Sequence, residues 1–173
     1  MASNVEIKAL VTDPRAMRAR MESFGTTAPD ELVQIDTFYN VPTGRLKLRE
    51  SADGTGELIY YQRADDPGPK VSNYFRAPSS DPASLRDVLA RSLGVRATVR
   101  KRRSVFLFGQ TRIHLDQVEG LGSFIEFEVV LRDGQPVSEG ERIATSLMNA
   151  LSVRAADLIP HAYVDLLESR ERM

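Results

Sequence analysis

The sequence predicts an α+β fold: an eight-stranded antiparallel sheet that closes into a β-barrel or tunnel with flanking helices. Polar and apolar residues alternate through many short segments, and residues two apart in a strand share a face. Short turns join most of these segments, which favours antiparallel pairing. Charged residues also recur on one face of strand after strand. An ordinary solvated face explains any single strand, but the repetition suits a sheet that closes around a charged interior.

The predicted strands follow from this alternation and from the turns between them. They cover residues 4–11, 32–39, 45–50, 57–63, 70–76, 99–108, 111–117 and 124–131. Asp53-Gly54 is a strong hairpin signal between two of them. The DDPGP segment at residues 65–69 is a turn rather than a domain linker, and residues 109–110 and 119–122 form the later turns.

Four helices are expected outside the sheet. Asp13 and Asp81 are each followed by proline, so a capping side chain precedes a proline at the first helical position. The two helices that begin there are predicted to end near Gly25 and Gly94. The other two helices are predicted over residues 138–151 and 155–170. Pro160 would kink or delay the last one.

The composition indicates a single domain over residues 1–173. Its 23 basic and 24 acidic residues leave a net charge of −1, so no global field favours nucleic acid or a membrane as a partner. The N-terminal segment has no apolar signal core, and no apolar run approaches membrane-spanning length. The lack of cysteine excludes disulfides and thiolate metal sites and fits a cytoplasmic protein. With only two histidines, a metal would be held mainly by carboxylates, which suits Mg²⁺ or Mn²⁺.

Lysines and arginines occupy one face of several predicted strands. The set is Lys47, Arg49, Arg63, Lys70, Arg76, Lys101 and Arg103. Such side chains are the usual partners of phosphate oxygens, and simple solubility is the alternative. Within the basic run at residues 100–103, alternation sends Lys101 and Arg103 inward with Lys47 and Arg49, and Arg100 and Arg102 outward. This split, and the lack of accompanying base-stacking aromatics, argue against a nucleic-acid patch.

The strongest carboxylate group is Glu126 and Glu128, together with Asp116. The two glutamates lie two apart on an otherwise apolar strand, and buried carboxylates need a cation or hydrogen-bond donors. A metal ion would satisfy them, and salt bridges to interior arginines are the alternative. His114 is expected to be a polar interior residue rather than a metal ligand.

Asn4, Glu6 and Lys8 share one face of the first strand. A carboxylate there can bind a hard cation, and a lysine two residues on can reach the phosphate that the cation bridges. An exposed edge strand is the simpler explanation of this triplet alone. The sequence contains no P-loop, G-x-S-x-G or H-E-x-x-H motif, so these three catalytic types have no support.

Taken in order, these motifs resemble those of the CYTH superfamily, also called triphosphate tunnel metalloenzymes. Residues 4–8 (NVEIK) are similar to its E-x-E-x-K signature. The further matching blocks are residues 34–39, 44–49, 58–63, 70–74, 99–103, 112–128 and 163–167. The resemblance covers essentially the whole chain and is nearest to the short, class IV adenylate cyclase-like branch.

The resemblance implies an eight-stranded antiparallel tunnel that binds a triphosphate beside Mg²⁺ or Mn²⁺. The metal ligands that it implies are Glu6, Asp116, Glu126 and Glu128. The catalytic residues that it implies are Lys8, Lys101 and Arg103. The substrate-binding residues that it implies are Lys47, Arg49, Arg63, Lys70, Arg76 and Arg112. A monomer or a homodimer is expected.

The resemblance further implies a metal-dependent enzyme whose substrate is a small triphosphate such as ATP, thiamine triphosphate or tripolyphosphate. We expect a class IV adenylate cyclase-like reaction, from ATP to cyclic AMP and pyrophosphate. Inorganic tripolyphosphatase or thiamine triphosphatase activity is the alternative. Asn4 stands where the signature has its first glutamate, which removes one negative charge. Because of this departure, a third function is also considered: a non-catalytic module that binds a nucleotide or polyphosphate.

Overall fold

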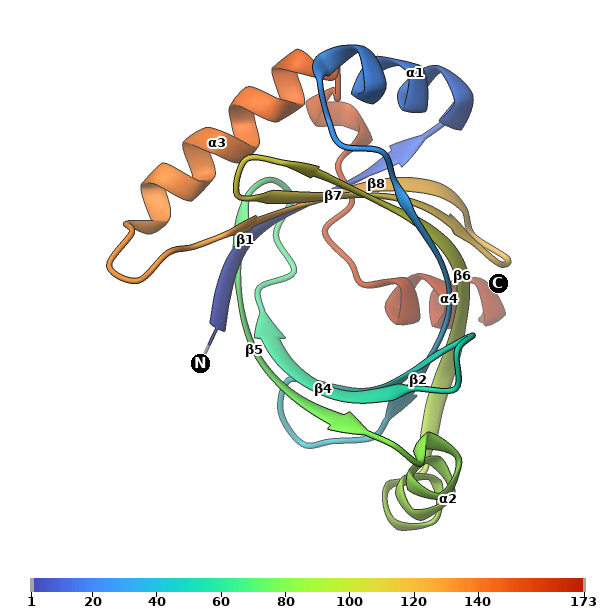
Figure 1. Ribbon diagram of the computed structural model, residues 1–173. Coiled ribbons are helices and arrows are strands. Elements are labelled where there is room, and N and C mark those ends of the chain that lie inside the picture. The colour runs from blue at the N-terminus through green and yellow to red at the C-terminus, as the bar shows by residue number, and fades with distance from the viewer. Residues whose placement is uncertain (1, 173) are drawn as a thin grey trace.

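A barrel of eight strands forms the centre of the protein, as a computed structural model describes it over residues 2–172 (Figure 1). The strands are β1 (Ala2–Val11), β2 (Asp30–Tyr39), β3 (Arg45–Ser51), β4 (Gly56–Arg63), β5 (Lys70–Ser79), β6 (Val95–Phe108), β7 (Thr111–Val118) and β8 (Gly122–Val130). They close in the order β1-β5-β4-β3-β2-β6-β7-β8, and every neighbouring pair is antiparallel. The predicted fold class is therefore confirmed.

Four α-helices flank the barrel within residues 2–172. They are α1 (Pro14–Phe24), α2 (Pro82–Leu93), α3 (Val137–Ala150) and α4 (Tyr163–Glu171). In Figure 1, α1 and α3 lie on one side of the barrel and α2 on the opposite side. The predicted caps form, because Asp13 accepts hydrogen bonds from the backbone N–H groups of Arg15 and Ala16, and Asp81 accepts one from Ser84.

The main hydrophobic core lies between the barrel wall and the helices, not inside the barrel. Val5 and Ile7 of β1 point outward into this core, where they meet Met21 of α1 and Leu147 of α3. A Cβ on Gly140 of α3 would lie 2.7 Å from a methyl carbon of Val5, so only glycine lets the helix come this close. Because the apolar side chains of these strands are used outside, the alternate positions are free to carry charge inside.

Strand β6 is longer than the alternation predicts, since it begins at Val95 rather than near residue 99. The extra residues continue the ladder with β2, whose Tyr39 lies opposite Val95 after a register shift at Phe38. Pairing with a long neighbouring strand, rather than a polar–apolar pattern of its own, defines this end of β6.

The prediction of one helix over residues 155–170 is wrong. A 3₁₀ turn, η1 (Ala155–Asp157), is followed by an extended segment, and α4 begins only at Tyr163. In that segment the N–H of Ile159 donates to the carbonyl of Lys8. Pro160 cannot donate a helical hydrogen bond and disfavours helix at the residue before it, which explains the delay.

None of the helices in the described part of the chain has the length and apolar character needed to span a membrane.

Candidate active site in the barrel lumen

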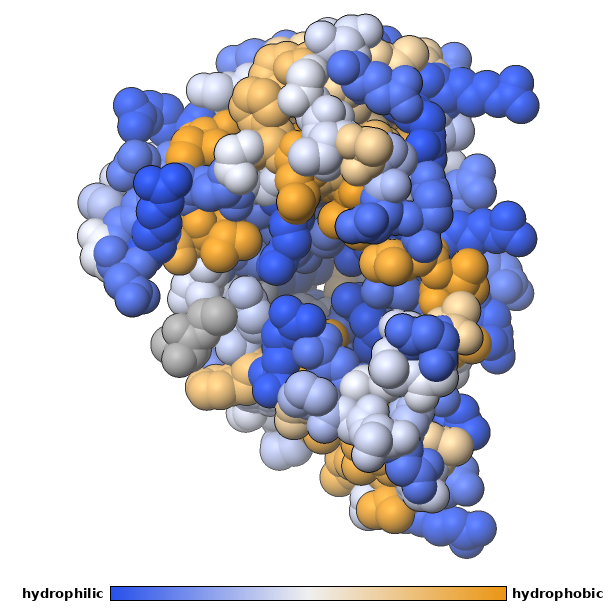
Figure 2. All heavy atoms as spheres, in the orientation of Figure 1, coloured by the Kyte–Doolittle hydropathy of each residue, from blue (hydrophilic) through white to orange (hydrophobic). Residues whose placement is uncertain are grey.

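The barrel encloses a charged cavity of about 290 Å³ that receives side chains from all eight strands. Figure 2 shows hydrophilic residues around the central hollow, viewed along the barrel as in Figure 1. The side chains predicted for the site that line this cavity are Glu6, Lys8, Lys47, Arg49, Arg63, Arg76, Lys101, Arg103, Arg112, Glu126 and Glu128. Arg100 and Arg102 are exposed on the outer surface, as the alternation predicts.

Two predicted site residues, Lys70 and Asp116, are buried beside the cavity rather than on its surface. The Nζ of Lys70 donates to the carbonyl of Asp66 at 2.9 Å. Burial lowers the pKa of Lys70 to about 8, and Arg63 and Lys8 contribute to this decrease. The surroundings of Asp116 are described below.

Three cations from two strands, β3 and β6, converge on one carboxylate, that of Asp36 on β2. Lys47 Nζ lies 3.0 Å from Asp36, Lys101 Nζ lies 2.8 Å away, and Arg49 donates two hydrogen bonds of 2.8 Å. Burial alone raises the pKa of Asp36, but Arg49, Lys101 and Lys47 outweigh it and hold this pKa well below its ordinary value. Asp36 therefore orients the side chains of Lys47, Arg49 and Lys101, the three nearby residues that are candidates for binding phosphate.

Burial also acts on the lysines of this cluster. It lowers the pKa of Lys101 to about 7, against the opposing effect of Asp36, and nearby Arg49 and Arg103 lower it further. More cationic charge is packed here than one aspartate can neutralise. The cluster is thus prepared for a polyanion.

The opposite part of the lumen carries the carboxylates. Glu6 lies directly across from Glu128 in the β1–β8 ladder, and Lys8 lies across from Glu126. Burial raises the pKa of Glu6, and the like charge of Glu128 raises it further. Facing carboxylates destabilise a sheet unless a cation lies between them.

Glu126 and Glu128 stay anionic because of neighbouring cations. Lys8 Nζ lies 3.2 Å from Glu126, and Arg103 donates to the same carboxylate at 2.9 Å. Burial raises the pKa of Glu126, but these two cations bring it well below its ordinary value. Arg112 donates to Glu128 at 2.9 Å. Burial raises the pKa of Glu128, but His114, Arg112 and Arg103 outweigh it and lower this pKa.

Oxygen donors here fit a hard divalent cation. Besides the three glutamates, the lumen offers Asn4, whose Oδ1 is buried and has no hydrogen-bond partner within residues 2–172. An unsatisfied carbonyl oxygen beside carboxylates is a suitable ligand for such an ion. The residues present therefore fit a metal of the Mg²⁺ or Mn²⁺ type.

Asp116 and Tyr163 form a buried support behind Arg103. Arg103 donates to the two oxygens of Asp116 at 2.7 and 2.6 Å, and the Tyr163 hydroxyl donates to Asp116 at 2.8 Å. The Tyr163 ring also lies 3.9 Å from Lys8 Nζ. Both oxygens of Asp116 are thus engaged in orienting Arg103.

Sequence reasoning did not select Asp36 or Tyr163 as site residues. Asp36 carried a usable signal, since it shares a strand face with Gln34 and precedes the basic pair Lys47 and Arg49. Tyr163 belongs to the matching block at residues 163–167, but no local pattern indicates its contacts, because these depend on where the C-terminal segment crosses the barrel.

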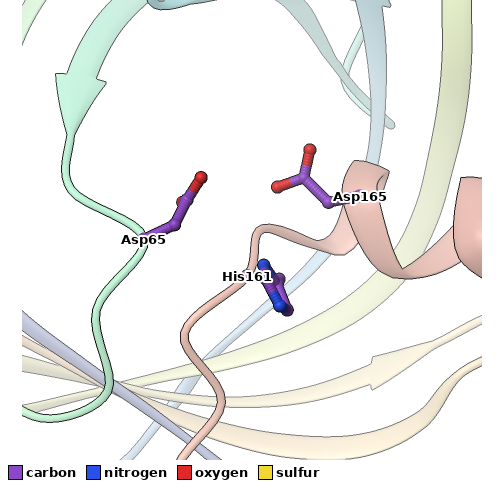
Figure 3. Close-up of side chains that lie close together, drawn as sticks. All are labelled: Asp65, His161 and Asp165. Atoms are coloured by element: carbon purple, nitrogen blue, oxygen red, sulfur yellow. The ribbon is translucent and has the colours of Figure 1, made fainter.

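A second group of potential ligands, Asp65, His161 and Asp165, lies between the β4–β5 connection and the start of α4 (Figure 3) and does not line the cavity. Arg45 donates to Asp65 and to Asp165 at 2.8 Å, and Arg96 also donates to Asp165. Guanidinium groups already neutralise these carboxylates. The group ties the β4–β5 connection to α4.

The closed barrel and its charged lumen define a tunnel-type domain, and comparison with known proteins identifies its family. The model of the CYTH domain matches residues 2–163, so the chain belongs to the CYTH domain family. A relative from Methanocaldococcus jannaschii named “Putative adenylate cyclase” is 23% identical over 174 residues, covering 94% of this chain and 97% of the relative.

Solved structures share the fold. A protein from Pyrococcus horikoshii superposes with a TM-score of 0.85 at 21% identity, covering 94% of this chain and 98% of its own. A Hippeastrum protein described as having a dominant triphosphatase activity gives a TM-score of 0.67 at 12% identity, covering 98% of this chain and 96% of its own. At these identities the likeness shows the architecture.

Proposed function

We propose that the protein is a metal-dependent enzyme that acts on an organic triphosphate inside the barrel, with ATP converted to cyclic AMP and pyrophosphate. The observation that carries the proposal is the pairing of two opposite charge groups in one lumen. A cationic cluster around Asp36 faces a carboxylate group built from Glu6, Glu126 and Glu128. This is the arrangement that a polyphosphate and its counter-cation require.

The phosphate chain would be bound by the lumen cations. Arg49 and Arg103 would each offer phosphate the Nη1 group, which their bonds to Asp36, Asp116 and Glu126 do not use. Lys47 and Lys101 would add point charges. The hydrogen bonds now made to Asp36 keep three of these side chains in place before substrate arrives. Lys8, which lies beside Glu126, would contact the phosphate nearest the metal.

Glu6, Glu126 and Glu128 would hold the divalent ion, with Asn4 near them. When bound, this ion would neutralise charge on the phosphate oxygens. Arg103 is held by two hydrogen bonds to Asp116, so it would contribute charge stabilisation from a preorganised position.

An aromatic wall beside the cations favours a nucleoside triphosphate over inorganic tripolyphosphate. Phe38 and Tyr61 both line the cavity, and their ring centres lie 5.5 and 5.6 Å from Lys47 Nζ. Such a surface suits the flat face of a base or thiazolium ring next to bound phosphates.

A triphosphatase is the second candidate. The same lumen would serve a reaction in which water attacks the terminal phosphorus, and the fold relative from Hippeastrum is described with that activity. The two reactions differ in which phosphorus faces the nucleophile, which is set by the depth at which the substrate binds.

One assay separates these functions. The protein is incubated with ATP, thiamine triphosphate or tripolyphosphate and with Mg²⁺ or Mn²⁺, and products are separated by ion exchange. Cyclic AMP with pyrophosphate supports the proposal, and orthophosphate supports the second candidate. Saturable binding with no product from any substrate would show a binding module and would overturn both.

A further inference from the structure

We infer that the Nδ1 of His114 is a ligand of the metal, alongside Glu126 and Glu128, and that this nitrogen makes the site prefer Mn²⁺ over Mg²⁺. The inference rests on the proposed function, because it concerns the ion used in the same lumen. It departs from the sequence-based expectation that His114 is a polar interior residue rather than a metal ligand.

The position of His114 brings its ring to the carboxylates. His114 on β7 lies directly opposite Glu126 on β8, and Glu128 is the next inward-facing residue on β8. Nδ1 lies 3.6 Å from an oxygen of Glu126 and 3.8 Å from an oxygen of Glu128. Both separations are longer than a hydrogen bond. They match ligands that share one ion, since each ligand atom stands about 2 Å from the metal.

The second observation is that this nitrogen is unsatisfied. His114 is 4% exposed, and its Nδ1 has no hydrogen-bond partner among residues 2–172. Buried polar atoms nearly always have a partner, so an orphan nitrogen aimed at two carboxylates indicates a missing ligand. The oxygen of Glu128 that it approaches is not the one that accepts from Arg112.

The ligand set determines which ion is favoured. Mg²⁺ prefers oxygen and keeps its waters, so a nitrogen adds little to its binding. First-row transition ions accept imidazole, and Mn²⁺ also suits the carboxylates that make up the rest of the site. A mixed nitrogen and oxygen set therefore points to Mn²⁺.

The chain supplies its own control, because it has only two histidines. His161 is exposed, does not line the cavity, and belongs to the group with Asp65 and Asp165 (Figure 3). Replacing the His161 side chain leaves intact its backbone carbonyl, which accepts a hydrogen bond from Lys8.

The test measures metal binding without substrate. Mn²⁺ and Mg²⁺ are titrated by calorimetry into the full chain, His114→Gln and His161→Gln, and bound Mn²⁺ is examined by pulsed electron paramagnetic resonance. We expect nitrogen coupling in the wild type and in His161→Gln, and its loss in His114→Gln. We also expect Mn²⁺ affinity to fall at least about tenfold in His114→Gln, with Mg²⁺ affinity changed much less. If His114→Gln does not fold, ¹⁵N-histidine labelling of the wild type decides, since a coordinated imidazole changes the coupling pattern.

Three other outcomes would overturn the inference. Loss of coupling only in His161→Gln would place the ion in the outer group and overturn the inference. Mn²⁺ that binds without nitrogen coupling but is lost in Glu126→Gln would mean an all-oxygen site, which overturns the inference and leaves the proposed function standing. No metal binding with or without tripolyphosphate would overturn both.

Discussion

At the scale of single residues, two glutamates of β8 are the part of the lumen on which the proposed chemistry most depends. We predict that Glu126→Gln and Glu128→Gln each lower metal-dependent turnover at least about 100-fold, because each removes an anionic ligand while keeping the side-chain volume. Turnover at limiting Mg²⁺ and circular dichroism are the measurements. Glu141→Gln, on the exposed surface of α3, is the matched control. Wild-type activity in both variants would mean that the metal site lies elsewhere.

Asn4 is the residue at which this chain departs from the E-x-E-x-K signature. We predict that Asn4→Glu tightens Mn²⁺ binding several-fold, because a carboxylate adds formal charge where the amide offers only a carbonyl dipole. Repulsion from Glu6 and Glu128 bounds the gain. Calorimetric titration with a non-reacting triphosphate analogue measures the effect, and Asn149→Glu adds the same charge outside the lumen as a control. Equal affinities for the wild type and Asn4→Glu would remove Asn4 from the site.

Lys101 should make phosphate binding depend on pH. With a pKa lowered to about 7 by burial, its ammonium is present below that pH and lost above it. The affinity for metal-free tripolyphosphate should therefore decrease as pH rises through about 7. The affinity is measured as a function of pH by fluorescence competition, with EDTA present, for the wild type and for Lys101→Met. Because the ligand titrates in the same way in both experiments, the difference between the two proteins reports on Lys101. An identical pH dependence in both proteins would contradict the assignment.

Alternation along single strands is enough to predict which cations and carboxylates face inward. It is not enough to predict which of them touch. Lys101 and Asp36 are 65 positions apart, and Tyr163 and Asp116 are 47 positions apart. These contacts depend on the register of paired strands and on the path of the C-terminal segment, which no local pattern encodes.

At the scale of elements, Asp36 on β2 joins β3 and β6 through its three cations. Its pKa is held below the unfolded value, so its contribution to stability is present above about pH 4 and is lost as pH falls through the folded pKa. At neutral pH, Asp36→Asn should lower the free energy of unfolding by about 3–5 kcal/mol, because buried cations lose their partner.

Urea denaturation at pH 7 and at low pH measures this contribution, with the exposed Asp133→Asn as control. The difference between the wild type and Asp36→Asn should shrink at low pH. A constant difference, or none, would show that Asp36 does not hold the strands together through its charge.

Most elements could be predicted because their signals are local: alternation for the strands, and aspartate followed by proline for α1 and α2. The start of α4 could not, because residues 155–159 suit a helix and Pro160 alone does not indicate whether the helix kinks or begins later. Pro160 and the hydrogen bond from Ile159 to the Lys8 carbonyl keep the segment before α4 extended along β1. Here tertiary contact overrides local propensity.

At the scale of the whole molecule, the fold places its apolar core outside the barrel and its charge inside. The lumen cations repel one another until an anion is bound, so a polyphosphate should stabilise the entire barrel. At 100 times its dissociation constant, tripolyphosphate should add about 2.7 kcal/mol of stability. For a chain of this size that corresponds to an increase in Tm of about 5–10 °C.

Differential scanning fluorimetry with and without tripolyphosphate tests this prediction, and sodium sulfate at equal ionic strength is the control. A shift that sulfate reproduces in full would indicate general screening of surface charge rather than a polyphosphate site.

The most direct test of the central claim is a ³¹P NMR time course in which ATP is incubated with the protein and Mn²⁺. The Mn²⁺ in each sample is chelated before the spectrum is recorded. The account predicts growth of the cyclic AMP and pyrophosphate signals as the ATP signals decline, and no change with Glu126→Gln. ATP signals that stay constant with the wild-type protein, while the analogue still binds in the calorimeter, would contradict the claim that this lumen is an active site.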